Sequence, residues 1–360
     1  MDKEVQINPK MVTLARQTRG LSQKDLSEII GISPSMLSNI ENAIGYIPLK
    51  MSLINEMIKA LDFNIKFFEK EGKVCLPSSG YFRRHKSVSK REMDQAVGQM
   101  NIIISMVDKY MEMIDIPDLN IIDWDVELQG SPLIAAQNLR KLWGIQRGRI
   151  QNLSKLIEDN GIFVVECDFK TDKIDGFSIQ SENNGRPLIF VNSNYTEDRK
   201  RLTVAHELGH IILHLGRYDI SEYRDVEEEA FDFASEFLVP LKEFKAQLGQ
   251  EKLTIAKLGH LKQYWRTSMK SFVFKSQKYS LITNNQARYL YQKLAPYRKK
   301  EPIELQPQEK PSLLGEMIYT VETELKFDKH ELSEMVGLNE PEFSRLRIKA
   351  MKNLPKLRVA

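Results

Sequence analysis

The stretch that most constrains this chain is residues 196–215, TEDRKRLTVAHELGHIILHL, which carries His206 and His210 four residues apart. Residues four apart on a helix stand on nearly the same face, so both imidazoles can reach one metal ion. Glu207 lies beside that line, where its carboxylate can take a proton from a zinc-activated water. The pattern predicts a helix capped by Thr196, with His206 and His210 as zinc ligands and Glu207 as general base.

A second helix is expected to complete this site. Residues 225–239, DVEEEAFDFASEFLV, have apolar residues at helical spacing. A catalytic zinc ion usually takes three protein ligands and keeps one position open. Glu228 lies opposite the apolar face, and Glu227 and Glu229 flank it, so either of these two could bend towards the metal. The pattern alone leaves the third ligand open between them.

Two further residues near the motif have alternative interpretations. Cys167 is a rival thiolate ligand, although a cysteine at the end of a strand is more often a small buried residue. His214, one turn beyond His210, is either a core histidine or a group that supports the site, and we expect the core role.

Composition places the chain among ordinary globular proteins. Apolar residues make up 42% of its 360 residues and charged residues 28%. No apolar run reaches the length of a membrane span, and no signal-peptide pattern is present. Two cysteines are too few for a disulfide framework, so we expect a cytoplasmic protein. A net charge of +3 gives no strong attraction to nucleic acid, and DNA binding must be argued locally.

The first 70 residues carry a local argument for DNA binding. Ser22 is a helix cap, Gly31 suits the turn that ends the helix, and Ser33 caps a second helix that begins with Pro34. This pattern predicts a helix-turn-helix, whose second helix would lie in the major groove. The residues expected to face bases or phosphates are Ser35, Met36, Ser38 and Asn39.

This segment resembles the Xre/Cro-type repressor DNA-binding domain. The resemblance rests on Gln23, Leu26, Gly31, Ile32, Ser33, Leu37, Ser38 and Glu41. It implies that Gln23 touches the DNA backbone and that residues 33–38 read bases. Residues 1–62 hold seven basic and seven acidic side chains, and the second helix has no exposed Arg or Lys. The alternative is a helical bundle that has lost DNA binding and serves for dimerisation.

Patterning divides the rest of the chain. We expect a linker and long helix over residues 71–122, a peptidase-like unit over 123–245, a helical extension over 246–300 and a C-terminal helical unit over 312–360. Linkers are expected at residues 75–80 and 301–311, and a basic cluster at 82–86 and 90–91. A long helix is expected over 92–113, and strands over 162–166, 176–179 and 188–192. The basic cluster could reach phosphates that flank the DNA site. The long helix could hold the two ends of the protein apart or pair with a second copy in a homodimer.

The C-terminal unit contains an echo of the first. Residues 332–338 and 343–344 align with 26–32 and 37–38 at a constant offset of 306. We therefore expect a second helix-turn-helix in shape. Its second helix begins Asn339-Glu340-Pro341-Glu342, and these acids would repel phosphates. A packing or partner-binding role is the expectation here.

The body of the chain resembles the ImmA/IrrE family of zinc metallopeptidases. The resemblance rests on residues 139–144 (LRKLWG), 175–178 (DGFS), 190–193 (FVNS), 198–214 and 227–240. It implies a zincin-like fold, a Zn²⁺ cofactor, and Glu229 as third ligand because this acid directly precedes Ala230. It also implies a protein substrate, namely a partner repressor whose cleavage releases stress-response or mobile-element genes.

The expected fold class is mainly α with a small β-sheet (α+β). The expected function is a DNA-binding regulator with zinc endopeptidase activity on a repressor, without membrane association. The rival is a non-proteolytic transcription factor whose peptidase-like body senses a ligand, but such a pocket has no need of Glu207. A third possibility is that the helix-turn-helix only tethers the protease to repressor-bound DNA.

Overall fold

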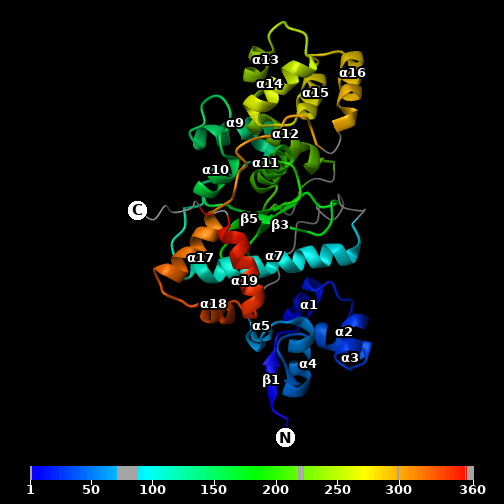
Figure 1. Cartoon of the computed structure of the whole chain (residues 1–360), viewed down its shortest axis with the longest axis vertical. Coiled ribbons are helices and arrows are strands. Elements are labelled where there is room, and N and C mark those ends of the chain that lie inside the picture. Colours follow the sequence, from blue (N-terminus) through cyan, green and yellow to red (C-terminus); the bar gives the residue numbers. More distant parts are fainter. Residues whose placement is uncertain are drawn as a thin grey trace.

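The structure is a computed structural model of the whole chain, and it describes residues 2–70, 88–217, 220, 223–297, 300–352 and 354. The expected linker 75–80 and the basic residues 82–86 lie outside the described residues. The fold is mostly helical with two small sheets, as the sequence predicts. Figure 1 shows the N-terminal unit at one end, a helical extension at the other, and helix α7 crossing between them. No helix among the described residues has the length and apolar character needed to cross a bilayer.

The N-terminal unit is a helical bundle with a short hairpin. Its elements are β1 (Glu4–Ile7), α1 (Pro9–Thr18), α2 (Gln23–Ile29), α3 (Pro34–Glu41), β2 (Ile47–Lys50), α4 (Met51–Leu61) and α5 (Ile65–Glu69). Ser22 and Asp25 form a capping box at the start of α2, and the Ser33 hydroxyl accepts from the Met36 N–H at the start of α3. Gly31 turns the chain between these helices at φ 71°. The caps and the turn therefore lie where the sequence places them.

Helix α7 (Lys90–Met111) is the central element of the molecule. A capping box between Ser89 and Glu92 begins it, and most of its apolar residues are buried. It packs against α1, where an added Cβ at Gly98 would lie 2.8 Å from the Thr18 Cα. It also packs beneath the main sheet (Figure 1). The N-terminal and the C-terminal units both pack against it.

The main sheet is a middle layer between α7 and the helices above. It consists of β3 (Phe163–Cys167), β4 (Gly176–Gln180) and β5 (Pro187–Asn192) in the order β3-β5-β4, with β3 parallel and β4 antiparallel to β5. Alternate residues belong to different clusters, with Phe163 and Phe190 on the α7 side and Val164 and Ile189 on the other. The sheet is therefore buried on both faces.

Helix α11 (Glu197–Leu213), which carries the predicted zinc motif, covers the second face of the sheet with α12 (Val226–Leu238) packed against it. The neighbouring helices are α8 (Val126–Gln129), α9 (Pro132–Leu142) and α10 (Leu153–Asp159). Helix α11 packs on β4, β5 and α12. A Cβ added to Gly209 would lie 3.1 Å from the Ala230 Cα of α12. This close approach explains why a glycine is tolerated inside α11.

A helical extension follows, and after it residues 301–311 form a segment fixed to the peptidase-like body, here called the strap. The extension is formed by α13 (Leu241–Leu248), α14 (Ile255–Trp265), α15 (Met269–Lys278), α16 (Asn284–Leu294) and the short 3₁₀ helix η1 (Ala295–Tyr297). The expected linker 301–311 is held by buried ion pairs: Lys262 contacts Glu301 at 2.8 Å, and Arg201 pairs with Glu309. It is a fixed strap on the peptidase-like body, and α17 begins directly after it.

The C-terminal unit repeats the first unit, as the offset predicts. Helices α17 (Leu313–Thr323), α18 (Lys329–Met335) and α19 (Glu340–Met351) follow the order of α1, α2 and α3, and α18 matches α2 residue for residue at the offset of 306. Gly337 turns the chain at φ 70°, as Gly31 does at 71°.

One ion pair in each unit extends the repeat. Arg16 binds Glu41 through two hydrogen bonds of 2.6 and 2.8 Å, joining α1 to the end of α3. At the same offset, Arg347 binds Glu322 through two hydrogen bonds that join α19 to α17. The charges have changed places while the pair has kept its position. This correspondence supports a common plan for the two units.

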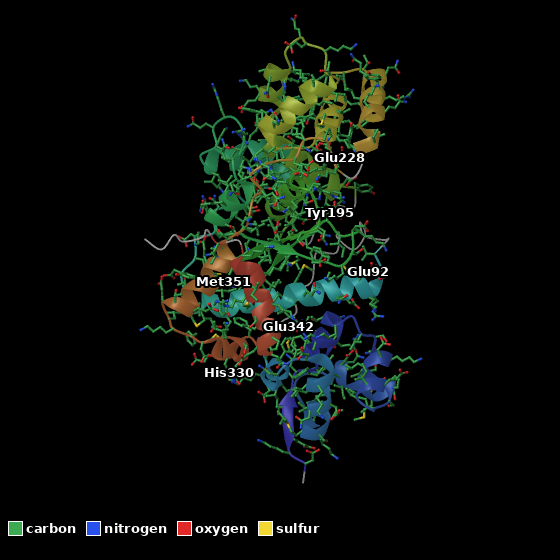
Figure 2. The ribbon with its side chains drawn as sticks, viewed as in Figure 1. Glu92, Tyr195, Glu228, His330, Glu342 and Met351 are labelled. Carbon is green, nitrogen blue, oxygen red and sulfur yellow. The ribbon has the colours of Figure 1, made fainter. Side chains whose placement is uncertain are left out.

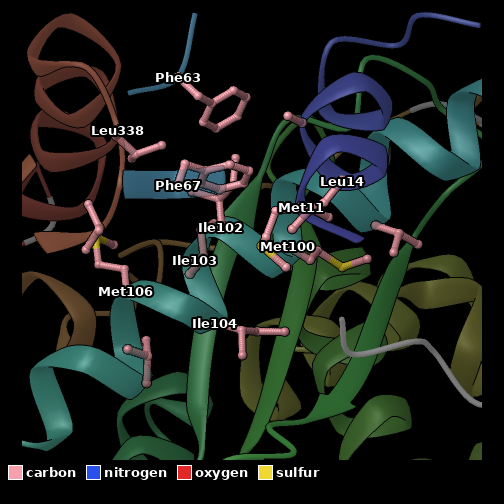
Figure 3. Packing of buried hydrophobic residues seen from close by; sticks show 14 of the residues in the cluster. Met11, Leu14, Phe63, Phe67, Met100, Ile102, Ile103, Ile104, Met106 and Leu338 are labelled. Carbon is pink, nitrogen blue, oxygen red and sulfur yellow. The ribbon is translucent and has the colours of Figure 1, made fainter. Parts of the chain in front are cut away.

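The two units contact each other directly. The Arg19 guanidinium binds the Glu342 carboxylate at 2.5 and 3.0 Å, and Figure 2 shows Glu342 on the side of α19 that faces the N-terminal unit. Phe63 forms an isolated antiparallel bridge with Leu338. Figure 3 shows Phe63, Phe67 and Leu338 where the two units meet, and these side chains belong to the same apolar cluster as the buried residues of α7. The first and last units of the chain thus share one core.

Candidate metal centre

Helices α11 and α12 bring three possible metal ligands together. The Nε2 atoms of His206 and His210 are 3.1 Å apart, and Glu227 oxygens lie 3.2 and 3.4 Å from them. Ligands about 2.0–2.1 Å from a tetrahedral zinc ion are separated from one another by roughly 3.3–3.4 Å. Within the part of the chain that the structure describes, these three residues form the group of His, Cys, Asp and Glu side chains suited to a metal ion. The donor set fits zinc in both chemistry and spacing.

Glu207 lies next to this group with its carboxylate held in place. It is buried, and the Ser178 hydroxyl of β4 donates a hydrogen bond of 2.8 Å to its Oε2. A Cβ at Gly176, two residues earlier on β4, would lie 2.6 Å from Thr203 and 3.6 Å from the Glu207 Cγ. The small residue lets the edge strand approach α11 closely. The Glu207 carboxylate is therefore held through its Oε2 atom.

Glu229, the third ligand implied by the resemblance, lies elsewhere in the structure. Arg224 donates two hydrogen bonds to it, at 2.9 and 2.7 Å, and His214 lies 2.9 Å from its Oε2. Glu227 takes the place beside the histidine pair. The reason is geometric: residues two apart on α12 point about 200° apart, so both cannot face the same side chains.

The Glu229 cluster continues to the metal group through two imidazoles. His214 Nδ1 lies 3.0 Å from His210 Nδ1, and its Nε2 contacts Glu229. Burial acts to raise the pKa of Glu229, but the hydrogen bonds from Arg224 and His214 outweigh it and lower this pKa to about 2. Burial also lowers the pKa of His214. The His214 side chain is largely buried, as the core expectation requires, and it also links Glu229 to His210.

Cys167, the rival ligand, is not part of the group. Its side chain is buried in the cluster on the α7 side of the sheet, whereas α11 covers the other side. Burial raises the pKa of its thiol to about 11. The structure thus places Cys167 as a small core residue without thiolate character.

Five of the six residues expected to contact DNA lie on α3 or at its N-cap, and Gln23 lies on α2. Four of them are exposed at the start or along the outer face of α3, and Ser38 is half-buried; the exposed four are Ser33, Ser35, Met36 and Asn39. Gln23 is half-buried and donates a hydrogen bond of 2.8 Å to Glu41. Its amide therefore supports the Arg16–Glu41 pair in this structure. The DNA contacts themselves stay predictions.

Two residues of this region, Ser178 and Arg224, are not indicated by the sequence pattern, and Glu227 is one of the two acids that the pattern leaves open. Ser178 lies on a strand 29 residues before Glu207, and no spacing rule connects it to the histidine motif. Arg224 lies in the connection before α12, where no periodicity indicates a partner. Glu227 was one of two open choices, and its placement depends on the rotation of α12 about its axis.

Comparison with known protein families agrees with this geometry. Residues 14–68 match a helix-turn-helix family, and residues 157–276 match the M78 peptidase family, described as the IrrE N-terminal-like domain. The second match includes the metal group, Glu207 and Ser178. No curated protein matches the chain. The chain therefore joins an N-terminal helix-turn-helix domain to an IrrE N-terminal-like domain of the M78 peptidase family.

Proposed function

We propose that this protein is a cytoplasmic DNA-binding regulator and a zinc-dependent endopeptidase that cleaves a partner repressor. The observation that carries the proposal is the group formed by His206, His210 and Glu227 beside a fixed Glu207. The matched helix-turn-helix supports recruitment to DNA, and the M78 match supports peptide hydrolysis.

The chemistry assigns a role to each residue. His206, His210 and Glu227 would hold the ion, and bound zinc supplies Lewis acidity that activates water and polarises a carbonyl. The Glu207 carboxylate takes a proton from the attacking water and passes it to the nitrogen of the leaving amine as the C–N bond breaks. Ser178 keeps Glu207 oriented during both transfers.

The sheet offers a place for an extended substrate. Strand β4 pairs with β5 along one edge, and no other strand of the described residues pairs with its opposite edge. A substrate segment can add to such an edge through backbone hydrogen bonds. Because Ser178 of β4 contacts Glu207, a segment bound there would pass the general base.

The test is cleavage of the repressor encoded beside this gene. The zinc-loaded chain is expected to cut it, and Glu207→Gln is expected to lose cleavage by a factor of about 10² or more while retaining zinc. Glu228→Gln is the matched control, because Glu228 is exposed on α12 and pairs with Lys278. Failure of the wild-type chain to cleave any neighbouring repressor would contradict the proposal and favour a non-proteolytic sensor.

A further inference from the structure

One cavity lies away from the metal group. It has a volume of about 590 Å³ and opens at the edge of β3, whereas Ser178 and Glu207 lie at the β4 side of the sheet. Its walls are α7, β3, the strap residues 308–311 and the helices α17 and α19. Volumes of this size are typical of small-molecule sites. The position separates this cavity from the peptidase chemistry.

The charges that line the cavity do not balance. Its four acids each pair with a cation, in the contacts Glu166–Lys200, Asp168–Lys170, Glu309–Arg201 and Glu342–Arg19. Three of these four cations come from outside the cavity lining. Four lining cations have no ion pair with any described residue, namely Lys310, Arg345, Lys349 and Lys352. The rim therefore carries an excess of positive charge that attracts an anion.

The floor of the cavity is apolar. Ile102, Ile103 and Met106 of α7 line it from one side, and Val165 of β3 and Leu346 of α19 line it from others. An apolar body buried against these side chains would be stabilised by its removal from water. A fully solvated inorganic anion would gain nothing from this floor.

We propose that this cavity binds a small organic anion with an apolar body, such as a carboxylate or phosphate carried on an aliphatic chain. The apolar part lies against the α7 side chains, and the anionic group meets Arg345 and Lys349 on α19. This inference does not depend on peptidase activity, because none of the proposed metal or catalytic residues lines the cavity.

A ligand in this place would touch the contacts that join the parts of the molecule. Glu342 in its wall binds Arg19 of the N-terminal unit. Lys200 in its wall lies on α11, six residues before His206, and binds Glu166 of β3 at 2.5 Å. Occupation would therefore bias how the helix-turn-helix and the peptidase-like body sit together. The ligand would also contact the strap residues 308–311, which precede α17.

The test uses three probes on the full-length protein. Decanoate should displace the fluorescent anion 1-anilinonaphthalene-8-sulfonate and raise the melting temperature, since a ligand that binds only the folded state stabilises it. Decanol, which lacks the charge, and inorganic phosphate, which lacks the chain, should each bind at least about tenfold more weakly, a difference of 1.4 kcal/mol.

Charge-reversal variants locate the site. The double variant Arg345→Glu with Lys349→Glu should weaken decanoate binding by at least about tenfold. Both side chains are exposed, so we expect the variant to fold, and circular dichroism checks that it does. Lys141→Glu, an exposed lysine on α9 outside the cavity, is the matched control. Equal binding of decanoate and decanol, or equal losses in the double variant and Lys141→Glu, would overturn the proposal. So would the absence of any decanoate binding.

Discussion

The N-terminal unit (α1 to α3) and the C-terminal unit (α17 to α19) follow one plan but turn their last helix towards different surroundings. The outer face of α3 meets solvent, with Met36 44% exposed. The corresponding position on α19, at the offset of 306, is Glu342, which binds Arg19 and lines the cavity. Asn39 corresponds to Arg345, which also lines the cavity. The second helix thus faces solvent in one unit, whereas in the other it contacts the N-terminal unit and lines the cavity.

The difference shows that a helix-turn-helix pattern specifies shape before it specifies function. Caps and turn glycines recur in both units because the backbone needs them. The outer residues of the second helix differ: those of α3 meet solvent, whereas Glu342 of α19 binds Arg19 and Arg345 lines the cavity.

Removing the Arg16–Glu41 pair should lower the free energy of unfolding more than removing the Arg347–Glu322 pair. Arg16→Met leaves the buried Glu41 carboxylate without its main partner and should lower the free energy of unfolding by about 3–5 kcal/mol. Arg347→Met should cost less, because the Arg347–Glu322 pair is more exposed. Thermal unfolding of both variants measures the difference. The exchange Arg16→Glu with Glu41→Arg should recover part of the loss, and equal losses at both sites would contradict the comparison.

The turn glycines form a second matched pair. Gly31→Ala should cost about 1–2 kcal/mol from its positive φ alone, because nothing lies within 4 Å of the added Cβ. Gly337→Ala should cost roughly 1–3 kcal/mol more, because its Cβ would lie 2.8 Å from the Phe67 Cα. Denaturant titration of the two variants gives the comparison. A smaller loss at Gly337 would mean that the two units do not pack as described.

Substitutions on the outer face of α3 should change the affinity for DNA, whereas matching substitutions on α19 should not. Asn39→Glu should weaken sequence-specific binding about tenfold to hundredfold, since it places an acid where α3 would meet the major groove. Arg345→Glu, at the matching position, should leave the affinity unchanged. Fluorescence anisotropy with operator DNA measures both. A comparable loss in Arg345→Glu would show that α19 also meets DNA.

The first helices of the two units should differ in their response to pH. The Asn8 side chain caps α1, whereas Glu158 of α10 accepts from the Ser312 and Leu313 N–H groups at the start of α17. Burial raises the pKa of Glu158 from 4.5 to about 7. A raised pKa of an acid in the folded state means that its stabilisation is complete below pH 4.5 and is lost as the pH rises through 7.

Glu158→Gln removes this titration and keeps a carbonyl acceptor. The fall in stability between pH 4.5 and 7.5 should therefore be smaller in the variant, by on the order of 1–2 kcal/mol. Melting temperatures across this pH range provide the measurement. Asn8→Ser, which replaces one neutral cap by another, should leave the pH profile as it is in the wild type. Identical profiles for wild type and Glu158→Gln would contradict the assignment.

Much of this architecture follows from local sequence signals. Ser22, Ser33 and Gly31 mark helix ends because capping and positive φ are local requirements, and the spacing of His206 and His210 fixes their common face. Contacts between distant segments do not follow in this way. The pairing of Arg19 with Glu342 spans 323 residues, and no periodicity predicts it.

The choice between Glu227 and Glu229 as the proposed third ligand also cannot be made from local sequence signals. Periodicity identifies the buried face of α12, but the acids beside that face reach different neighbours along α11. Glu227 lies beside His206 and His210, while Glu229, two residues later on α12, lies beside His214, one turn beyond His210 on α11. The packing of the two helices, set in part by Gly209, decides between them.

Zinc content after dialysis against a weak chelator tests the proposed centre most directly. Glu227→Ala should lose the metal, because it removes a ligand, whereas Glu229→Ala should keep one zinc ion per chain with affinity weakened about 10- to 100-fold through His214 and His210. Retention of zinc in Glu227→Ala together with its loss in Glu229→Ala would contradict the account.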